Sequence, residues 1–252
     1  MMRICIKLEY DGTNYVGWQR QQNSKSVQGT VENAIKYLIG KEVTVYGSGR
    51  TDTGVHALGQ VAHFDCNKKI ECNEIRDGLN YYLKSEKISI LSAHKVSEDF
   101  HSRFSAIERT YIYKILNRRP PPTIDIKSKW HVPVNLNLSK MISAGQLLIG
   151  THDFSTFRGA NCQSKSSIKK IDEIKIINDK DDIEIKVIAK SFLYKQVRSI
   201  VGSLKCVGEG RWSVLDMKTA LEACNRKKVG FVAPAHGLYL FDIKFGLEYK
   251  LN

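Results

Sequence analysis

Apolar residues change their spacing along the chain, and the changes come in the same order in both halves. From Ile4 to Tyr10 apolar and polar side chains alternate, which predicts a half-buried strand. From Val27 to Leu38 the apolar spacing is helical, with Ser26 as the N-cap and Gly40 as the end. Further elements are expected in the first half: strands at 43–46, 60–65 and 88–96, and a helix at 75–83.

The second half follows the same order of strand, helix, strands, helix and strand. Its expected elements are a strand at 109–116, a helix at 138–149, a hairpin of 171–177 with 183–189, helices at 197–208 and 213–224, and a closing strand at 238–245. This order favours split β-α-β halves. We therefore predict an α+β chain of two ferredoxin-like (RRM-like) domains, residues 1–107 and 108–252, whose mainly antiparallel sheets meet at a central cleft.

The charge of the chain is strongly unbalanced. Its 252 residues include 39 Lys and Arg against 26 Asp and Glu, a net charge of +13 with histidine neutral. Such an excess suits a polyanion, either a nucleic acid or an anionic membrane surface, although Lys-rich surfaces also occur on proteins without one. No apolar run approaches the roughly 20 residues that cross a bilayer. Residues 1–10 alternate and do not form the apolar block of a secretory signal, so a cytoplasmic protein is expected.

The six cysteines include no C-x-x-C pair. A disulfide scaffold is not expected in a chain of this length without an export signal. His63 and Cys66 form an H-x-x-C arrangement with Cys72 nearby, which admits a zinc site. However, a second close pair is missing and His63 falls in an expected strand. Ordinary buried thiols are the preferred interpretation, and no metal is expected.

A glycine-rich loop, residues 47–57, has the sequence G-S-G-R-T-D-T-G-V-H-A. Its glycines permit tight turns and the close approach of a ligand. The loop has neither the Walker pattern G-x-x-x-x-G-K-[ST] nor the dinucleotide pattern G-x-G-x-x-G, so these phosphate cradles are excluded. One interpretation is a surface loop with an Asx turn. The other is a catalytic carboxylate, Asp52, held ionised by a neighbouring guanidinium.

This loop resembles the defining motif of the TruA family of tRNA pseudouridine synthases, whose core is G-R-T-D-x-G-V-H-A. Further segments resemble the family in the same order along nearly the whole chain: residues 10–13, 17–21, 26–29, 104–106, 109–113, 152–155, 162–166, 191–194, 197–202 and 233–240. Each segment is short, and their order makes the resemblance specific. Lys195 and Gln196 depart from the pattern, since many relatives carry histidine and methionine there. The resemblance implies the pseudouridine synthase fold, with the catalytic site in the cleft.

The resemblance implies the isomerisation of uridine to pseudouridine, in which the N1–C1′ bond breaks and a C5–C1′ bond forms. No group is added and no electrons are exchanged, so no cofactor is expected. The family's catalytic aspartate corresponds to Asp52, which attacks C1′ or C6 as a nucleophile or acts as a base. By resemblance the substrate is tRNA, at positions 38, 39 and 40 of the anticodon stem-loop, and the protein is a homodimer. The alternative is a non-catalytic tRNA-binding relative.

The resemblance also assigns substrate-binding roles. Arg198 matches the counter-ion of the aspartate, Tyr111 the tyrosine that stacks on the flipped uracil, and Arg50 the arginine that helps to extrude the nucleotide. Leu238 or Leu240 is expected to form an apolar wall beneath the base, with core packing as the competing interpretation. Candidate phosphate contacts are Arg20, Arg103, Arg109, Arg118, Arg119 and Arg158.

Overall fold

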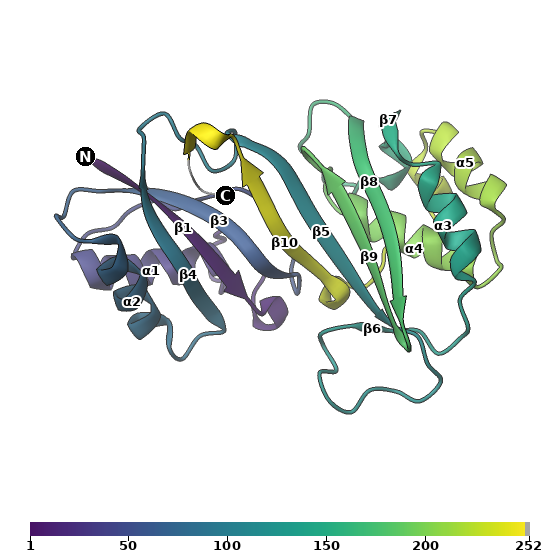
Figure 1. Ribbon diagram of the computed structural model, residues 1–252, viewed down its shortest axis with the longest axis horizontal. Coiled ribbons are helices and arrows are strands. Elements are labelled where there is room, and N and C mark those ends of the chain that lie inside the picture. Colours follow the sequence, from purple (N-terminus) through teal and green to yellow (C-terminus); the bar gives the residue numbers. More distant parts are fainter. Residues whose placement is uncertain (250–252) are drawn as a thin grey trace. The chain divides into compact units, whose positions relative to one another are not determined.

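The computed structural model describes residues 1–249, which divide into two compact units (Figure 1). The first unit consists of Met1–Arg109 and the segment that begins at Tyr239, and the second unit is Thr110–Leu238. The domains predicted from the sequence, 1–107 and 108–252, differ from these units in two respects: the first unit extends to Arg109, and the segment from Tyr239 onward belongs to it. Pairing between segments so far apart in the chain leaves no local pattern, so periodicity could not reveal it.

The sheet of the first unit has the strand order β4-β1-β3-β10. The elements of this unit are β1 (Met2–Tyr10), the 3-10 turn η1 (Gly12–Asn14), α1 (Val27–Ile39), β2 (Tyr46–Gly47), β3 (His56–Cys66), α2 (Cys72–Leu83), β4 (Ile88–Val96), β10 (Leu238–Phe245) and η5 (Leu247–Tyr249). β1 pairs antiparallel with β3 and β4, whereas β10 pairs in parallel with β3. Figure 1 shows α1 and α2 together on one face of this sheet.

The core of the first unit follows from the alternation seen in the sequence. Ile4, Ile6 and Leu8 on β1 are completely buried, and burying each such side chain stabilises the fold by about 1.5–3 kcal/mol. Helix α1 begins and ends as predicted: the Ser26 hydroxyl accepts a hydrogen bond from the backbone N–H of Gly29, and Gly40 takes the left-handed conformation at φ +77°. The predicted half-buried strand and the first helix are therefore confirmed.

One predicted strand of the first unit is wrong. The segment 43–46 was expected to be extended, but the strand there is only Tyr46–Gly47. The backbone of Val45 is engaged elsewhere, because its N–H donates to Glu32 Oε1 at 3.0 Å and its carbonyl accepts from Gln28 Nε2 at 3.1 Å. Side chains of α1 thus form the hydrogen bonds with the Val45 backbone that a neighbouring strand would otherwise have formed.

The second unit has the strand order β5-β9-β8-β7. Its elements are β5 (Ala106–Leu116), β6 (Trp130–His131), α3 (Leu138–Gln146), β7 (Gly150–Asp153), η2 (Ser155–Phe157), β8 (Ile168–Asp179), β9 (Asp182–Ala189), α4 (Gln196–Gly208), α5 (Val214–Glu222), η3 (Arg226–Lys228) and η4 (Ala235–Gly237). The predicted hairpin is present as β8 and β9, which pair antiparallel up to Asp179 opposite Asp182. In Figure 1 the helices α3, α4 and α5 lie toward the edge of this sheet that is formed by β7.

Helix α5 begins at the predicted cap. The Ser213 hydroxyl accepts from the backbone N–H of Asp216, and the Asp216 carboxylate accepts from the backbone N–H of Ser213. Together the two units confirm the predicted α+β class with mainly antiparallel strand pairing. Within the part of the chain that the structure describes, no helix combines the length and apolarity needed to span a bilayer.

Candidate active site

The candidate catalytic residue Asp52 lies in the loop that joins β2 to β3, and its backbone is fixed on both sides. Asp52 forms an isolated antiparallel bridge with Gly17, and the N–H of Trp18 donates to the carbonyl of Thr51 at 3.1 Å. After Asp52 the chain turns sharply, since the N–H of Val55 donates to the Asp52 carbonyl at 3.1 Å. The half-buried carboxylate is therefore presented by a fixed backbone.

Two glycines outside the loop allow this close packing. A Cβ atom on Gly17, whose φ is +108°, would lie 2.5 Å from the Thr51 carbonyl oxygen. A Cβ atom on Gly12 would lie 2.0 Å from the Val55 carbonyl oxygen. Both obstacles are backbone atoms that cannot swing aside, so any side chain at these positions would displace the loop.

Buried polar side chains hold the second part of the loop. The hydroxyl of Tyr10 lies 2.7 Å from the hydroxyl of Thr51, and both residues are buried. The buried His56 ring stacks on Tyr239 with centroids 4.7 Å apart. Nδ1 of His56 accepts a hydrogen bond from the backbone N–H of Gly12 at 3.1 Å, and Asp11 Oδ1 lies 3.2 Å from the same nitrogen.

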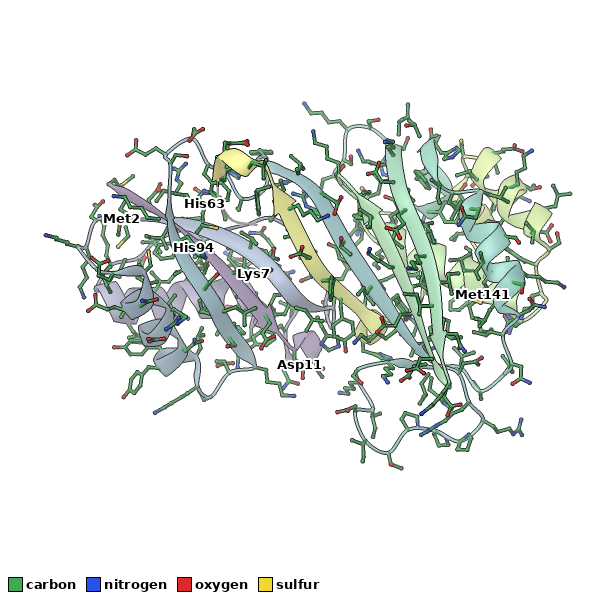
Figure 2. The ribbon with its side chains drawn as sticks, viewed as in Figure 1. Met2, Lys7, Asp11, His63, His94 and Met141 are labelled. Carbon is green, nitrogen blue, oxygen red and sulfur yellow. The ribbon has the colours of Figure 1, made fainter. Side chains whose placement is uncertain are left out.

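Asp11, labelled in Figure 2 where β1 ends, carries a negative charge close to this loop. Burial raises the pKa of its carboxyl, but hydrogen bonds from Lys87 and Thr13 outweigh that effect and lower the pKa to about 2. The Lys87 Nζ atom lies 2.6 Å from Asp11 Oδ2. The negative charge of Asp11 is thus stabilised by Lys87 and Thr13.

The first part of the loop is clamped by two other side chains. The completely buried Gln60 donates from Nε2 to the Gly49 carbonyl at 2.7 Å and accepts from the Gly49 N–H at 3.2 Å. The buried Arg109 donates from Nη2 to the carbonyls of Ser48 at 3.0 Å and Arg103 at 2.8 Å. Arg50 is exposed between these fixed points, where it can meet a ligand.

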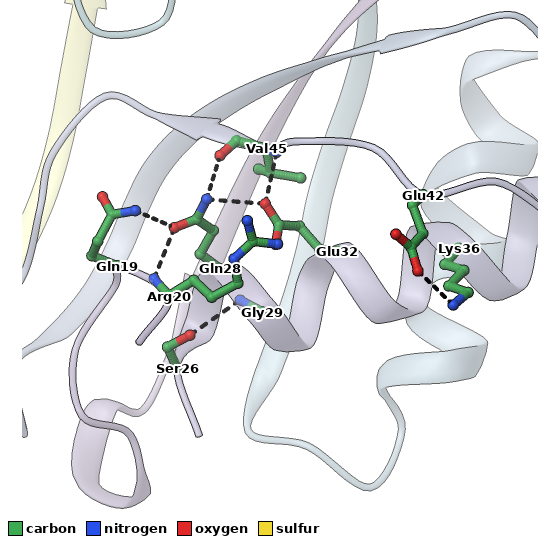
Figure 3. Close-up of polar contacts among 9 residues, drawn as sticks. All are labelled: Gln19, Arg20, Ser26, Gln28, Gly29, Glu32, Lys36, Glu42 and Val45. Atoms are coloured by element: carbon green, nitrogen blue, oxygen red, sulfur yellow. Dashed lines mark hydrogen bonds and ion pairs between the residues drawn. The ribbon is translucent and has the colours of Figure 1, made fainter. Parts of the chain in front are cut away.

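A polar network on α1 supports the strand-like segment that pairs with Asp52 (Figure 3). The buried Gln28 accepts from the N–H of Arg20 at 2.9 Å and from Gln19 Nε2 at 2.7 Å, and its own Nε2 donates to Glu32 at 2.9 Å. Arg20 Nη1 donates to Glu32 Oε2 at 3.0 Å. The backbone N–H groups of Val27 and Gln28 donate to the carbonyls of Gly17 and Trp18. The start of α1 therefore fixes residues 17–20.

The other predicted substrate-binding residues come from the second unit. Tyr111 on β5 is buried and meets Phe192 edge to face, with centroids 5.1 Å apart. Arg198 on α4 donates from Nε to the Ala233 carbonyl at 2.8 Å, and the Ala233 N–H donates to the Arg198 carbonyl at 3.0 Å. Leu238, the last residue of the second unit, is buried where β10 begins.

The residues that depart from the family pattern have local structural roles. Lys195 takes a positive φ of 60° at the start of α4. Gln196 is buried, and its Oε1 accepts from the N–H of Leu193 at 2.7 Å. Four of the arginines considered as phosphate contacts are also used within the fold. The side chains of Arg109, Arg118 and Arg158 donate to protein carbonyls, and Arg20 donates to Glu32.

The H-x-x-C arrangement does not form a metal pair. His63 and Cys66 are three residues apart on β3, so their side chains point to opposite faces of the sheet. The N–H of Ser102 donates to His63 Nδ1 at 3.2 Å. Among residues 1–249, no group of three or more His, Cys, Asp or Glu side chains is placed to hold a metal ion.

Comparison with known proteins decides the family. A family model described as tRNA pseudouridine synthase matches residues 7–105 and 144–246. This chain belongs to the tRNA pseudouridine synthase family. The tRNA pseudouridine synthase A of Maricaulis maris is 47% identical to it over 97% of this chain and 98% of the relative. That of Rhodopseudomonas palustris strain BisB18 is 49% identical over 97% of this chain and 100% of the relative.

As a member of this family the chain is an isomerase enzyme. The solved structure titled "Crystal structure of the archaeal box H/ACA sRNP Nop10-Cbf5 complex" aligns with 80% of this chain and 44% of its own, at 12% identity and a TM-score of 0.37.

The site residues predicted from the sequence fall in both units: Asp52 and Arg50 in the first, Tyr111, Arg198 and Leu238 in the second. Sequence patterns did not single out the supporting side chains of Tyr10, Gln60 and Glu32. Gln60 and Glu32 look like ordinary solvated residues in the sequence, and only their burial reveals that they hold backbone groups.

Proposed function

We propose that this enzyme converts uridine to pseudouridine in tRNA, at positions 38, 39 and 40 of the anticodon stem-loop, with Asp52 as the catalytic group and without a cofactor. Conversion of uridine in tRNA follows from the family to which the chain belongs. One observation carries the assignment of Asp52: its half-buried carboxylate stands on a loop whose backbone is bonded to residues 17–18 before the turn and to Val55 after it.

The reaction can proceed with the groups of a protein alone. The N1–C1′ bond breaks, the base rotates, the C5–C1′ bond forms, C5 loses a proton and N1 gains one. Nothing is oxidised or reduced, so no electron carrier is required. Asp52 serves as a nucleophile toward C1′ or C6, or as a base toward the sugar. Fixing the backbone on both sides of Asp52 limits the entropy lost when the reacting atoms come together.

The other predicted residues complete the proposed site. Arg198 takes the place of the family's counter-ion to the catalytic aspartate, and its Nε bond to the Ala233 carbonyl fixes the direction of the guanidinium. The Tyr111 ring stacks on the extruded uracil, and Leu238 forms the apolar wall beneath it. Arg50, exposed on the same loop as Asp52, fills the space that the extruded nucleotide leaves.

The substrate explains the charge of the chain. A net charge of +13 attracts the tRNA backbone, and a homodimer in the cytoplasm doubles the basic surface offered to one tRNA. The alternative function, a tRNA-binding relative without catalysis, needs the charge but has no use for the fixed carboxylate. We therefore favour the enzyme.

The proposed role of Asp52 is tested by release of tritium from tRNA labelled at uridine C5. Asp52→Asn is expected to release no label above background while binding tRNA. Asp77→Asn, which changes an exposed carboxylate on α2, is the matched control and is expected to behave as wild type. If Asp52→Asn releases label at the wild-type rate, Asp52 is not the catalytic group. If wild type leaves the label in place, the binding-only alternative holds.

A further inference from the structure

An aromatic cluster lies at the start of the catalytic loop, within the first unit. It consists of the exposed rings of Tyr46 and Phe104, the half-buried ring of His101 and the buried ring of His63 beneath them. His63, labelled in Figure 2 on β3, stacks on Tyr46 at 5.1 Å and meets His101 edge to face at 4.7 Å. The His101 and Phe104 centroids are only 4.4 Å apart.

The position of Phe104 is not explained by the fold. Its side chain is 74% exposed, although leaving a large apolar ring in water forgoes about 1.5–3 kcal/mol of burial. The turn that carries it is nevertheless well fixed, because the N–H groups of Phe104 and Ser105 both donate to the His101 carbonyl, at 3.0 and 2.8 Å. The His101 N–H in turn donates to the Ser105 hydroxyl at 3.0 Å. A fixed turn thus holds this ring in solvent.

Two connections join this turn to the catalytic loop. The Ser102 hydroxyl donates to the Tyr46 carbonyl at 2.6 Å, directly before the loop begins. Arg109 Nη2 bridges the carbonyls of Arg103 and Ser48, at 2.8 and 3.0 Å. Hydrogen bonds therefore connect the turn of the aromatic cluster directly to the loop that carries Asp52.

The charges at the aromatic cluster suit an anionic ligand that carries flat rings. The Arg103 guanidinium lies over the Phe104 ring, 5.7 Å from its centroid, so a cation stands beside the exposed ring. Burial lowers the pKa of His63 to about 4, and it also lowers the pKa of His101, which favours the neutral form of both imidazoles. Aromatic rings with a cation beside the exposed one match a nucleobase and its phosphate.

We propose that the exposed face of Phe104, backed by His101, is a stacking site for an unpaired nucleobase of the RNA substrate, with Arg103 on the adjacent phosphate. This base is distinct from the uridine that reacts at Asp52. The inference rests on the proposed function, since it takes the ligand to be the substrate RNA. The site holds a flanking nucleotide in place while the target uridine is converted.

The test compares Phe104→Ala with Phe104→Trp, which keeps a ring, and with Tyr37→Ala, which removes another exposed ring from α1. Tyr37 is 70% exposed, so the control removes similar apolar surface. With an unmodified tRNA transcript, Phe104→Ala is expected to raise KM about five- to a hundredfold, the range for one base on one ring. kcat should change little, Phe104→Trp should retain wild-type KM, and Tyr37→Ala should behave as wild type. In an Asp52→Asn variant, adding Phe104→Ala should weaken the affinity for tRNA by the same factor.

Three results would overturn the stacking site. The first is a wild-type KM for Phe104→Ala, and the second is an equal loss for Tyr37→Ala. The third is a change of sedimentation without a change in RNA affinity, which would make Phe104 a contact between protein chains. The proposed function fails separately, if wild-type enzyme forms no pseudouridine in the same transcript.

Discussion

The polar network on α1 gives a quantitative prediction about Glu32. Its side chain is 7% exposed and uses both oxygens: Oε1 accepts from Gln28 Nε2 and the Val45 N–H, and Oε2 accepts from Arg20 Nη1 (Figure 3). Glu32→Gln keeps the shape but turns one oxygen into an NH₂ group. Glu32→Ala removes every acceptor at once. The two substitutions should therefore differ in cost for reasons that the geometry supplies.

In Glu32→Gln the amide has two orientations, and the one that costs less free energy will be populated. If its oxygen stays toward Gln28 and Val45, the NH₂ group faces only the Arg20 guanidinium, and the Arg20 side chain is 63% exposed and can turn into water. The loss is then that of one ion pair whose arginine is solvent-exposed, about 0.2–1 kcal/mol. For Glu32→Ala, the buried N–H of Val45 loses its partner, which costs about 1–3 kcal/mol, and the lost side chain removes about 1 kcal/mol of packing.

Glu32→Ala is thus expected to cost about 3 kcal/mol in the free energy of unfolding and Glu32→Gln less than about 1 kcal/mol. Urea unfolding followed by circular dichroism at pH 7 measures both. Glu42→Gln, which opens the exposed pair with Lys36 in the same figure, is the matched control and should leave the midpoint unchanged. Equal losses for the two Glu32 variants would refute the orientation argument, and a wild-type midpoint for Glu32→Ala would refute the role of the network.

Three further predictions concern the loop, the pH response and the charge. Gly12→Ala should lower kcat at least about tenfold, or about 1.4 kcal/mol of transition-state stabilisation, because its Cβ would lie 2.0 Å from the Val55 carbonyl oxygen; tritium release measures this, and a wild-type kcat would show that the loop tolerates displacement. Burial lowers the pKa of His63 from 6.5 to about 4, so the unfolded chain binds more protons between these values, and the stability that is complete above pH 6.5 should fall as the pH drops toward 4. Urea midpoints at pH 7.5 and 4.5 should therefore differ less for His63→Asn than for wild type, and an equal difference would assign the pH response to other groups. The affinity for tRNA should fall steeply as salt rises, in filter binding from 50 to 200 mM salt (roughly the range over which phosphate contacts weaken), whereas a flat response would mean that the charge of +13 is incidental.

Much of the fold could be predicted from the sequence because many of its helices and strands are determined by residues close together in the chain. The alternation in β1, the Ser26 cap of α1 and the Ser213 cap of α5 depend on residues within a few positions of each other. The placement of β10 beside β3 could not be predicted in this way. A pairing of Tyr239 with His56 depends on two segments that meet only after folding.

Composition and periodicity alone did not select Asp52. They showed a carboxylate in a glycine-rich loop, and the resemblance to a family turned this into a catalytic residue. The structure adds the physical reason for the pattern around it: Gly12 and Gly17 are positions where only glycine fits against the loop backbone. The roles of Tyr111, Arg198, Arg50 and Leu238 stay predictions that substitution must test.

Glu32 shows why the side chains that support the site could not be predicted from the sequence. Gln28 and Glu32 are four residues apart on a helix, a spacing that normally indicates two solvated side chains supporting each other weakly. Here both side chains are buried against Val45, whose backbone is not paired in a strand. Gln28 bonds the Val45 carbonyl and Glu32 bonds the Val45 N–H, as a neighbouring strand would have done. The role of a polar residue is set by the backbone group it faces. That group lies thirteen positions away for Glu32, too far for any helical pattern to reveal.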